Sequence, residues 1–70
     1  MIVENKVLEQ ISKFLEKGDR AYFEHNTLWL QLEDETKQAK AAKIFYSLAR
    51  EYEGRVRISP TGYEYAIDFI

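Results

Sequence analysis

Two segments of this chain alternate apolar and polar side chains, and this pattern constrains the fold more than any other feature of the sequence. The first covers residues 20–24 and 28–33, and the second begins at residue 55 and runs to the end. Strict alternation predicts strands with one buried face. Turn residues interrupt both segments, His-Asn-Thr at 25–27 and Ser-Pro-Thr-Gly at 59–62. We therefore expect two β-hairpins, with Asn26 in a left-handed conformation and Gly62 at a positive φ.

Each hairpin is preceded by a segment with helical periodicity. Apolar side chains recur every three or four positions in residues 3–15, and the helix predicted there ends at Gly18. A second helix is predicted to open with Asp34, Glu35 and Thr36 and to end at Gly54. Its apolar stripe is Ala39, Ala42, Phe45, Leu48, Ala49 and Tyr52. Ile44 and Tyr46 lie beyond this stripe, so the second helix is apolar over a wider arc.

The two halves of the chain share their pattern. A shift of 35 positions, from Arg20 to Arg55, places the inward-facing residues of the first hairpin on those of the second. The matched residues are Ala21, Phe23, Leu28, Leu30 and Leu32 with Val56, Ile58, Tyr63, Tyr65 and Ile67. One interpretation is a repeat of residues 3–34 in residues 37–70, and the other is that any two amphipathic hairpins share such alternation.

These patterns predict one α+β domain over residues 1–70. The expected order is αββαββ, with two αββ units forming a four-stranded antiparallel sheet and both helices packed on one face, because neither half can bury its apolar face alone. The last segment, residues 63–70, is apolar at alternate positions up to the end of the chain. We expect this strand inside the fold or at an interface, and as a sheet edge it would offer pairing to a second molecule.

The face of the sheet away from the helices is the candidate site. It is predicted to carry Arg20, Tyr22, Trp29, Gln31, Glu33, Arg55, Arg57, Glu64, Ala66 and Asp68. We expect Tyr22 directly across from Trp29, and Arg57 across from Glu64. The proposed binding residues are Arg20, Tyr22, Trp29, Gln31, Arg55, Arg57 and Glu64.

Three interpretations of this face remain open. The first is that these residues are the ordinary polar and aromatic side chains of a solvated sheet face. Trp, Tyr and Arg are also the residue types enriched at the centres of protein interfaces, with Trp29 and Tyr22 as anchors. Aromatic and arginine side chains also suit single-stranded nucleic acid, as does a stripe of Lys37, Lys40 and Lys43 on the second helix, although the acidic residues of the sheet face would repel phosphate.

Composition excludes several other classes. The chain has no cysteine, so we expect no disulfide, and a single histidine, His25, makes a zinc site improbable. The acidic residues 33–35 are interpreted as a helix start, and no nucleophile–base pair or glycine-rich phosphate loop is found. We therefore predict no enzyme activity, no metal and no cofactor. The net charge of -2 differs from the basic signature of a nucleic-acid binder.

The expected function is that of a small protein-binding module. The N-terminal residues do not form a signal peptide, and no apolar run is long enough for a membrane span, so a cytoplasmic location is the default. Compact cysteine-free domains of this size are common among phage and mobile-element accessory proteins, which suggests an inhibitor or adaptor that occupies a surface of a host protein. The alternative is a nucleic-acid-binding regulator. A homodimer is compatible with either.

Overall fold

Two helices and a four-stranded antiparallel sheet make up the part of the chain that the structure describes, residues 3–33, 36–52, 56–60 and 64–69 of a computed structural model. The predicted α+β class is confirmed. In chain order the elements are α1 (Glu4–Ile11), a 3₁₀ turn η1 (Ser12–Phe14), β1 (Arg20–Glu24), β2 (Thr27–Gln31), α2 (Lys37–Tyr52), β3 (Val56–Pro60) and β4 (Glu64–Phe69).

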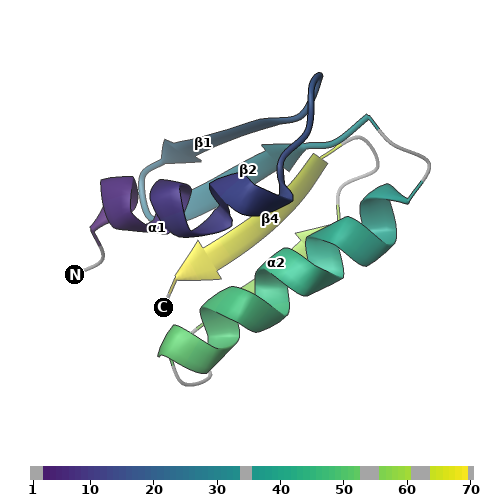
Figure 1. The fold of residues 1–70 in the computed structure, drawn as a ribbon. Coiled ribbons are helices and arrows are strands. Elements are labelled where there is room, and N and C mark those ends of the chain that lie inside the picture. The colour runs from purple at the N-terminus through teal and green to yellow at the C-terminus, as the bar shows by residue number, and fades with distance from the viewer. Residues whose placement is uncertain (1–2, 34–35, 53–55, 61–63, 70) are drawn as a thin grey trace.

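The C-terminal strand lies inside the sheet. The strand order is β1-β2-β4-β3, so β4 pairs with β2 on one side and with β3 on the other (Figure 1). This agrees with the expectation that the last strand lies inside the fold. The edges are β1 and β3, so β4 does not offer a free edge for pairing. The buried residues of β4 are Tyr65, Ala66, Ile67 and Phe69.

The register of the first hairpin agrees with the sequence, and that of the second does not. Tyr22 is paired with Trp29 as predicted. Arg57 is paired with Asp68 and not with Glu64, so the predicted register of the second hairpin is wrong by four residues. A shift of four leaves the same side chains on each face, because alternate residues share a face. The alternation pattern cannot distinguish these two registers, so it predicted the faces correctly and the pairing incorrectly.

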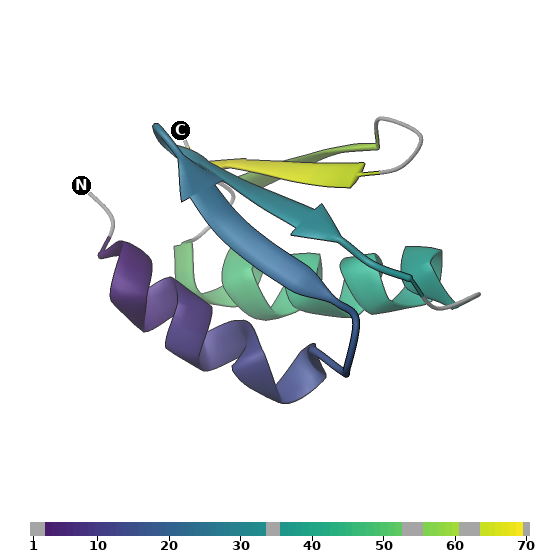
Figure 2. The ribbon, with the colours of Figure 1, turned by 90° about the horizontal axis from the view of Figure 1, so that it is seen from above.

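The core lies between the sheet and the helices, which are both on the same side of the sheet (Figure 2). Val7 and Ile11 of α1 belong to one buried cluster with side chains of β2, α2, β3 and β4, and Ala21 and Phe23 of β1 pack against it. The other buried members are Leu28, Leu30, Leu32, Ala41, Ile44, Leu48, Val56, Tyr65, Ile67 and Phe69. The predicted stripe of α2 needs correction. Its buried centre runs through Ala41, Ile44 and Leu48, whereas Ala39 is exposed and Phe45 is half-buried.

Local side-chain chemistry explains how the first helix ends. The hydroxyl of Ser12 donates a hydrogen bond to the carbonyl of Glu9 at 2.7 Å, within the 3₁₀ turn that replaces the last predicted turn of α-helix. The predicted helix stop at Gly18 is wrong, because α1 ends at Ile11 and the 3₁₀ turn ends at Phe14. Gly18 lies in the turn that follows, with a φ of +97°. Gly54 and Gly62 lie outside the described residues.

The tip of the first hairpin differs from expectation. The residue with a positive φ is His25, at 60°, and not Asn26. Asn26 instead binds the end of β4. Its side-chain amide donates to the carbonyl of Phe69, and its own carbonyl accepts the Phe69 N–H at 3.1 Å. The turn is therefore attached to the C-terminal strand by two hydrogen bonds.

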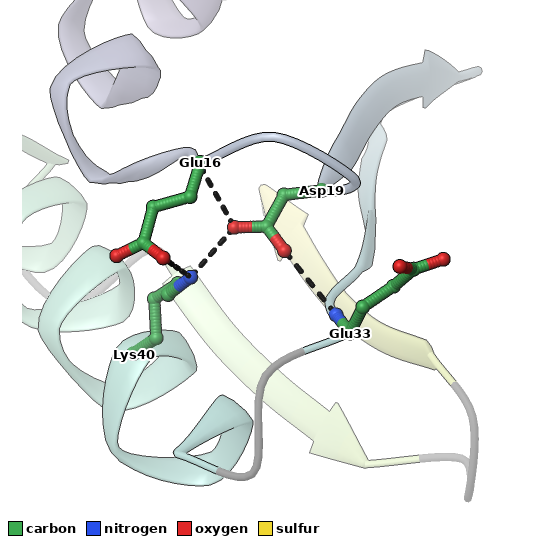
Figure 3. Close-up of polar contacts among 4 residues, drawn as sticks. All are labelled: Glu16, Asp19, Glu33 and Lys40. Carbon is green, nitrogen blue, oxygen red and sulfur yellow. Dashed lines mark hydrogen bonds and ion pairs between the residues drawn. The ribbon is translucent and has the colours of Figure 1, made fainter.

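A buried ion pair joins α2 to the loop before β1. Lys40 donates to the carboxylate of Asp19 at 2.6 Å, and the two side chains are only 8% and 2% exposed (Figure 3). The same carboxylate accepts the backbone N–H groups of Glu16 at 2.9 Å and Glu33 at 3.2 Å. Lys40 also lies 3.7 Å from the carboxylate of Glu16. One carboxylate thus connects three segments that are distant in sequence.

This arrangement corrects the predicted lysine stripe. Lys40 is buried and paired, so Lys37, Lys40 and Lys43 do not form a continuous basic surface. Burial alone would raise the pKa of Asp19, but the hydrogen bonds from Lys40 and from the two backbone N–H groups outweigh it. The pKa of Asp19 therefore lies below its ordinary value of 3.8.

Candidate functional site

The sheet face opposite the helices is organised as three rows of side chains that cross the strands. Paired residues of antiparallel strands point to the same side of a sheet, so the register defines each row. The middle row consists of Tyr22, Trp29, Ala66 and Ser59. The first outer row is Arg20, Gln31 and Glu64, and the second is Glu24, Thr27, Asp68 and Arg57.

The middle row forms the apolar centre of this face. Tyr22 is 37% exposed, whereas Trp29 is half-buried although no helix covers it. Ala66 is almost fully buried on the same open face. Its partners across the strands are Trp29 and Ser59, so its small methyl group lies between larger neighbours. The middle row therefore presents large aromatic side chains on β1 and β2, whereas the small side chain on β4 protrudes less from the sheet.

The indole of Trp29 has an unsatisfied donor. Its Nε1–H is shielded from solvent and has no hydrogen-bond acceptor within the described part of the chain. A buried donor without a partner costs about 1–3 kcal/mol of stability. Among the described residues, hydrogen bonding therefore does not account for the position of this indole.

The outer rows, in contrast, satisfy their own polar groups. Glu64 accepts a hydrogen bond from the Tyr22 hydroxyl at 3.4 Å and another from the Gln31 amide. Asp68 accepts one from the Thr27 hydroxyl at 2.8 Å, and its carboxylate lies 3.5 Å from Arg57. These contacts fix the carboxylates of β4 on either side of the aromatic row.

Electrostatics keep the Tyr22 hydroxyl protonated. Partial desolvation, and then the negative charge and hydrogen bond of Glu64, raise the pKa of Tyr22 above its ordinary value of 10.0. Tyr22 therefore remains a neutral hydrogen-bond donor at physiological pH. It can present both an apolar ring and a polar tip, as tyrosines at interfaces commonly do.

The predicted site residues come together with two exceptions. Arg20, Tyr22, Trp29, Gln31, Arg57 and Glu64 share the open face, as the alternation indicates. Arg55 lies outside the described residues. Glu33 follows the end of β2 and contributes its backbone N–H to Asp19, so it belongs to the buried ion-pair cluster rather than to the rows.

The charges of this face do not favour phosphate. Among its described residues, the carboxylates of Glu24, Glu64 and Asp68 outnumber the guanidinium groups of Arg20 and Arg57. Protein surfaces that bind nucleic acid gain most of their affinity from an excess of cationic side chains along the phosphate backbone of the ligand. The described ranges also contain no group of three metal-ligating side chains and no helix long and apolar enough to cross a membrane.

A second candidate surface lies on the helix side and was not predicted from the sequence. A groove runs between η1 and the outer side of α2, and we call it the helix groove. It is lined by Lys13, Phe14, Lys43, Tyr46, Ser47, Arg50 and Glu51. The spacing of Lys43, Tyr46 and Arg50 is helical and could have been noticed in the sequence. That Lys13 and Phe14 lie opposite them depends on how the helices pack.

Comparisons of this chain with protein-family models, with curated proteins and with solved structures find no match.

Proposed function

We propose that this chain is a small non-enzymatic protein-binding module whose open sheet face covers a surface of a partner protein, as an inhibitor or an adaptor. The observation that carries the proposal is the aromatic row of Tyr22 and Trp29 between two polar rows. Protein interfaces have this organisation, with an apolar centre rich in aromatic residues and a hydrated polar rim. Trp29 and Tyr22 are the anchors, and Arg20 and Arg57 orient the partner.

The size of the domain is adequate for this role. A standard protein interface buries about 800 Å² on each partner, which is roughly a sixth of the 5060 Å² accessible surface of this chain. The carboxylates of Glu64 and Asp68 are held by hydrogen bonds before binding, which lowers the ordering cost of these two side chains on association.

The finer description of the fold is part of the proposal. We interpret the chain as two αββ units, residues 3–34 and 37–70, with both helices covering one sheet face. The pairing of Leu30 with Tyr65, which are matched by the shift of 35 residues, supports this interpretation. The different register of the second hairpin restricts the likeness to the order of the elements, since the strand pairings of the two hairpins are not copies.

A homodimer also remains a prediction. Gln38, Ala42, Phe45, Tyr46, Ile58 and Tyr65 line a pocket of about 270 Å³ on the side of α2 next to the edge strand β3. No charged side chain is among them. This surface supports self-association, and it is separate from the aromatic row.

The proposal is tested with matched variants that each remove one hydrophobic side chain. Tagged wild-type protein, Trp29→Ala and Val3→Ala are used to capture partners from host lysate with and without nuclease. Val3 is 54% exposed and does not belong to the sheet face, so its variant controls for the general loss of a hydrophobic side chain. We expect a nuclease-resistant partner that Val3→Ala retains and Trp29→Ala loses, with the affinity reduced roughly thirtyfold or more.

Purified partner then gives a direct readout. Trp29 is the only tryptophan, so intrinsic fluorescence reports on the proposed interface alone. We expect the emission of Trp29 to change and saturate as a partner without tryptophan at its interface is added, while a melt shows that Trp29→Ala is folded. A partner that binds without changing this emission, or that Trp29→Ala retains, would contradict the proposal. Loss of capture upon nuclease treatment would move nucleic acid to first place.

A further inference from the structure

The helix groove is a second candidate site, and it lies on the other side of the molecule from the aromatic row. Its volume is about 590 Å³, and Lys13 and Phe14 of η1 face Lys43, Tyr46 and Arg50 of α2 across it. A smaller pocket of about 370 Å³ shares Lys13, Phe14 and Lys43 and extends the groove toward the start of α2. The two pockets form one continuous depression along the helices.

Two polar contacts between the helices fix the shape of this groove. The amide of Gln10 donates to the hydroxyl of Ser47 at 3.2 Å and to its carbonyl at 3.3 Å. After the end of η1, the carboxylate of Glu16 lies 3.7 Å from the buried Lys40. Lys13 and Phe14 lie between Gln10 and Glu16 in the sequence, and Lys43 lies between Lys40 and Ser47. The two contacts therefore hold the two helical segments in place on either side of the groove.

The groove concentrates positive charge on a chain whose net charge is -2. Lys13, Lys43 and Arg50 line the larger pocket, and Glu51 is its one acidic residue. None of these three cations forms an ion pair with a carboxylate in the described ranges, whereas Lys40 and Arg57 do. Three cations that have no ion-pair partner among the described residues, against one acidic residue, make the depression complementary to an anionic ligand.

Aromatic surface accompanies the charge. Phe14 is half-buried, and the ammonium group of Lys13 lies 5.3 Å from the centre of its ring. Tyr46 is 66% exposed, the largest value among the exposed large hydrophobic side chains of the described residues. A ligand that fits this groove therefore carries both negative charges and an apolar side chain.

We propose that the helix groove binds an acidic peptide segment of a partner protein. Lys43 and Arg50 are two helical turns apart, which places their attachment points roughly 10 Å apart along α2. They pair with carboxylates of the segment at a similar separation, and Lys13 contacts the segment from the opposite wall. An apolar side chain of the segment packs against Phe14 and Tyr46.

The charge distribution favours a peptide over nucleic acid. The cations are confined to one short groove, and Glu16 and Glu51 lie along its length. The phosphate backbone of a nucleic acid extends beyond the groove, where it would be repelled by these carboxylates and by a chain with net negative charge. A short acidic peptide segment needs to place only a few carboxylates, all of them beside the cations of the groove. The site is independent of the sheet face, so this proposal and the function proposed above fail separately.

The test measures binding of a fluorescein-labelled peptide, GEEFDEFEEG, by fluorescence anisotropy in low salt. A peptide with Gln and Asn in place of the acidic residues is the neutral reference. We expect the acidic peptide to bind and the neutral one to bind at least roughly tenfold more weakly. Lys43→Glu is expected to weaken binding by at least roughly tenfold, and Tyr46→Ala is also expected to weaken it.

Lys6→Glu is the matched control, because it makes the same charge change at an exposed residue of α1 that does not line the groove. We expect it to change binding less than about twofold, since exposed distant charges are screened, and we expect Trp29→Ala to have no effect. Equal losses for Lys6→Glu and Lys43→Glu would show general charge attraction and overturn the site. Displacement of the peptide by oligothymidine at lower concentration than by unlabelled peptide would assign the groove to nucleic acid instead.

Discussion

A chain that ends at Glu64 is expected to show no cooperative unfolding transition. The deletion removes Tyr65, Ile67 and Phe69, which are core residues, and it removes β4 from between β2 and β3. The remaining strands cannot form one sheet, and β3 loses its only neighbour among the described strands. A domain of this size has a total stability of roughly 4–10 kcal/mol, which this loss exceeds. Circular dichroism during a thermal melt measures the effect.

A point substitution gives a graded version of the same test. Ile67 has no exposed surface and is paired with Leu28 on one side and Ile58 on the other. Ile67→Ala is expected to lower the free energy of unfolding by about 3 kcal/mol. Val3→Ala, at a position that is 54% exposed, is the control and should change it by less than about 0.5 kcal/mol. A truncated chain with a cooperative melt would show that β4 is not central.

Breaking the buried ion pair is expected to have the second large effect. Asp19→Asn and Lys40→Met should each lower the free energy of unfolding by about 3 kcal/mol, because each removes one partner of a buried charge pair. The double variant should lose less than the sum of the two, with a coupling energy of about 2 kcal/mol, since it removes both charges together. Urea denaturation followed by Trp29 fluorescence provides these values.

The exposed ion pair is the matched control. Arg57 is 65% exposed and lies 3.5 Å from Asp68. Arg57→Met is expected to change stability by less than about 1 kcal/mol, because exposed pairs contribute little. If Asp19→Asn were no more damaging than Arg57→Met, the Asp19 carboxylate would not connect the three segments as described. Additive effects of Asp19→Asn and Lys40→Met would likewise contradict a direct pair.

The lowered pKa of Asp19 gives a pH dependence with a definite sign. The unfolded chain binds a proton at Asp19 at a higher pH than the folded chain does, because the folded pKa is below 3.8. The stabilising contribution of Asp19 is therefore complete above that value and is lost as the pH falls through the folded pKa. Urea midpoints between about pH 6 and about pH 2 should fall less steeply for Asp19→Asn than for wild type. Identical slopes would refute this.

The faces of the elements were predictable, whereas their neighbours were not. Alternation placed Leu28, Leu30 and Ile67 in the core and Tyr22 and Trp29 on the open face, because a strand exposes alternate residues to opposite sides. The same pattern is unchanged by a shift of four residues, so it could not assign Arg57 to Asp68. The alternation pattern also could not place β4 within the sheet. A central strand, which has a neighbouring strand on each side, and an edge strand covered by a second molecule have the same apolar pattern.

The candidate sites show the same division. The sheet face was predictable because its residues come from two local hairpins, although the half-burial of Trp29 and the burial of Ala66 depend on side chains from adjacent strands. The helix groove was not predicted, because Lys13 and Lys43 are 30 positions apart and only packing of the helices brings them together. The lysine stripe was misassigned for the same reason, since nothing local to Lys40 indicates that Asp19 lies beside it.

The sequence by itself determined the α+β class and the residues that each strand presents to the core. These depend on periodicity and on backbone preferences within a few residues, which any segment carries with it. The tertiary structure alone decided that β4 is central, that Lys40 is buried against Asp19, and that a cationic groove lies between the helices. Each of these depends on contacts between distant segments, whose energies come from shared burial and charge pairing that no single segment contains.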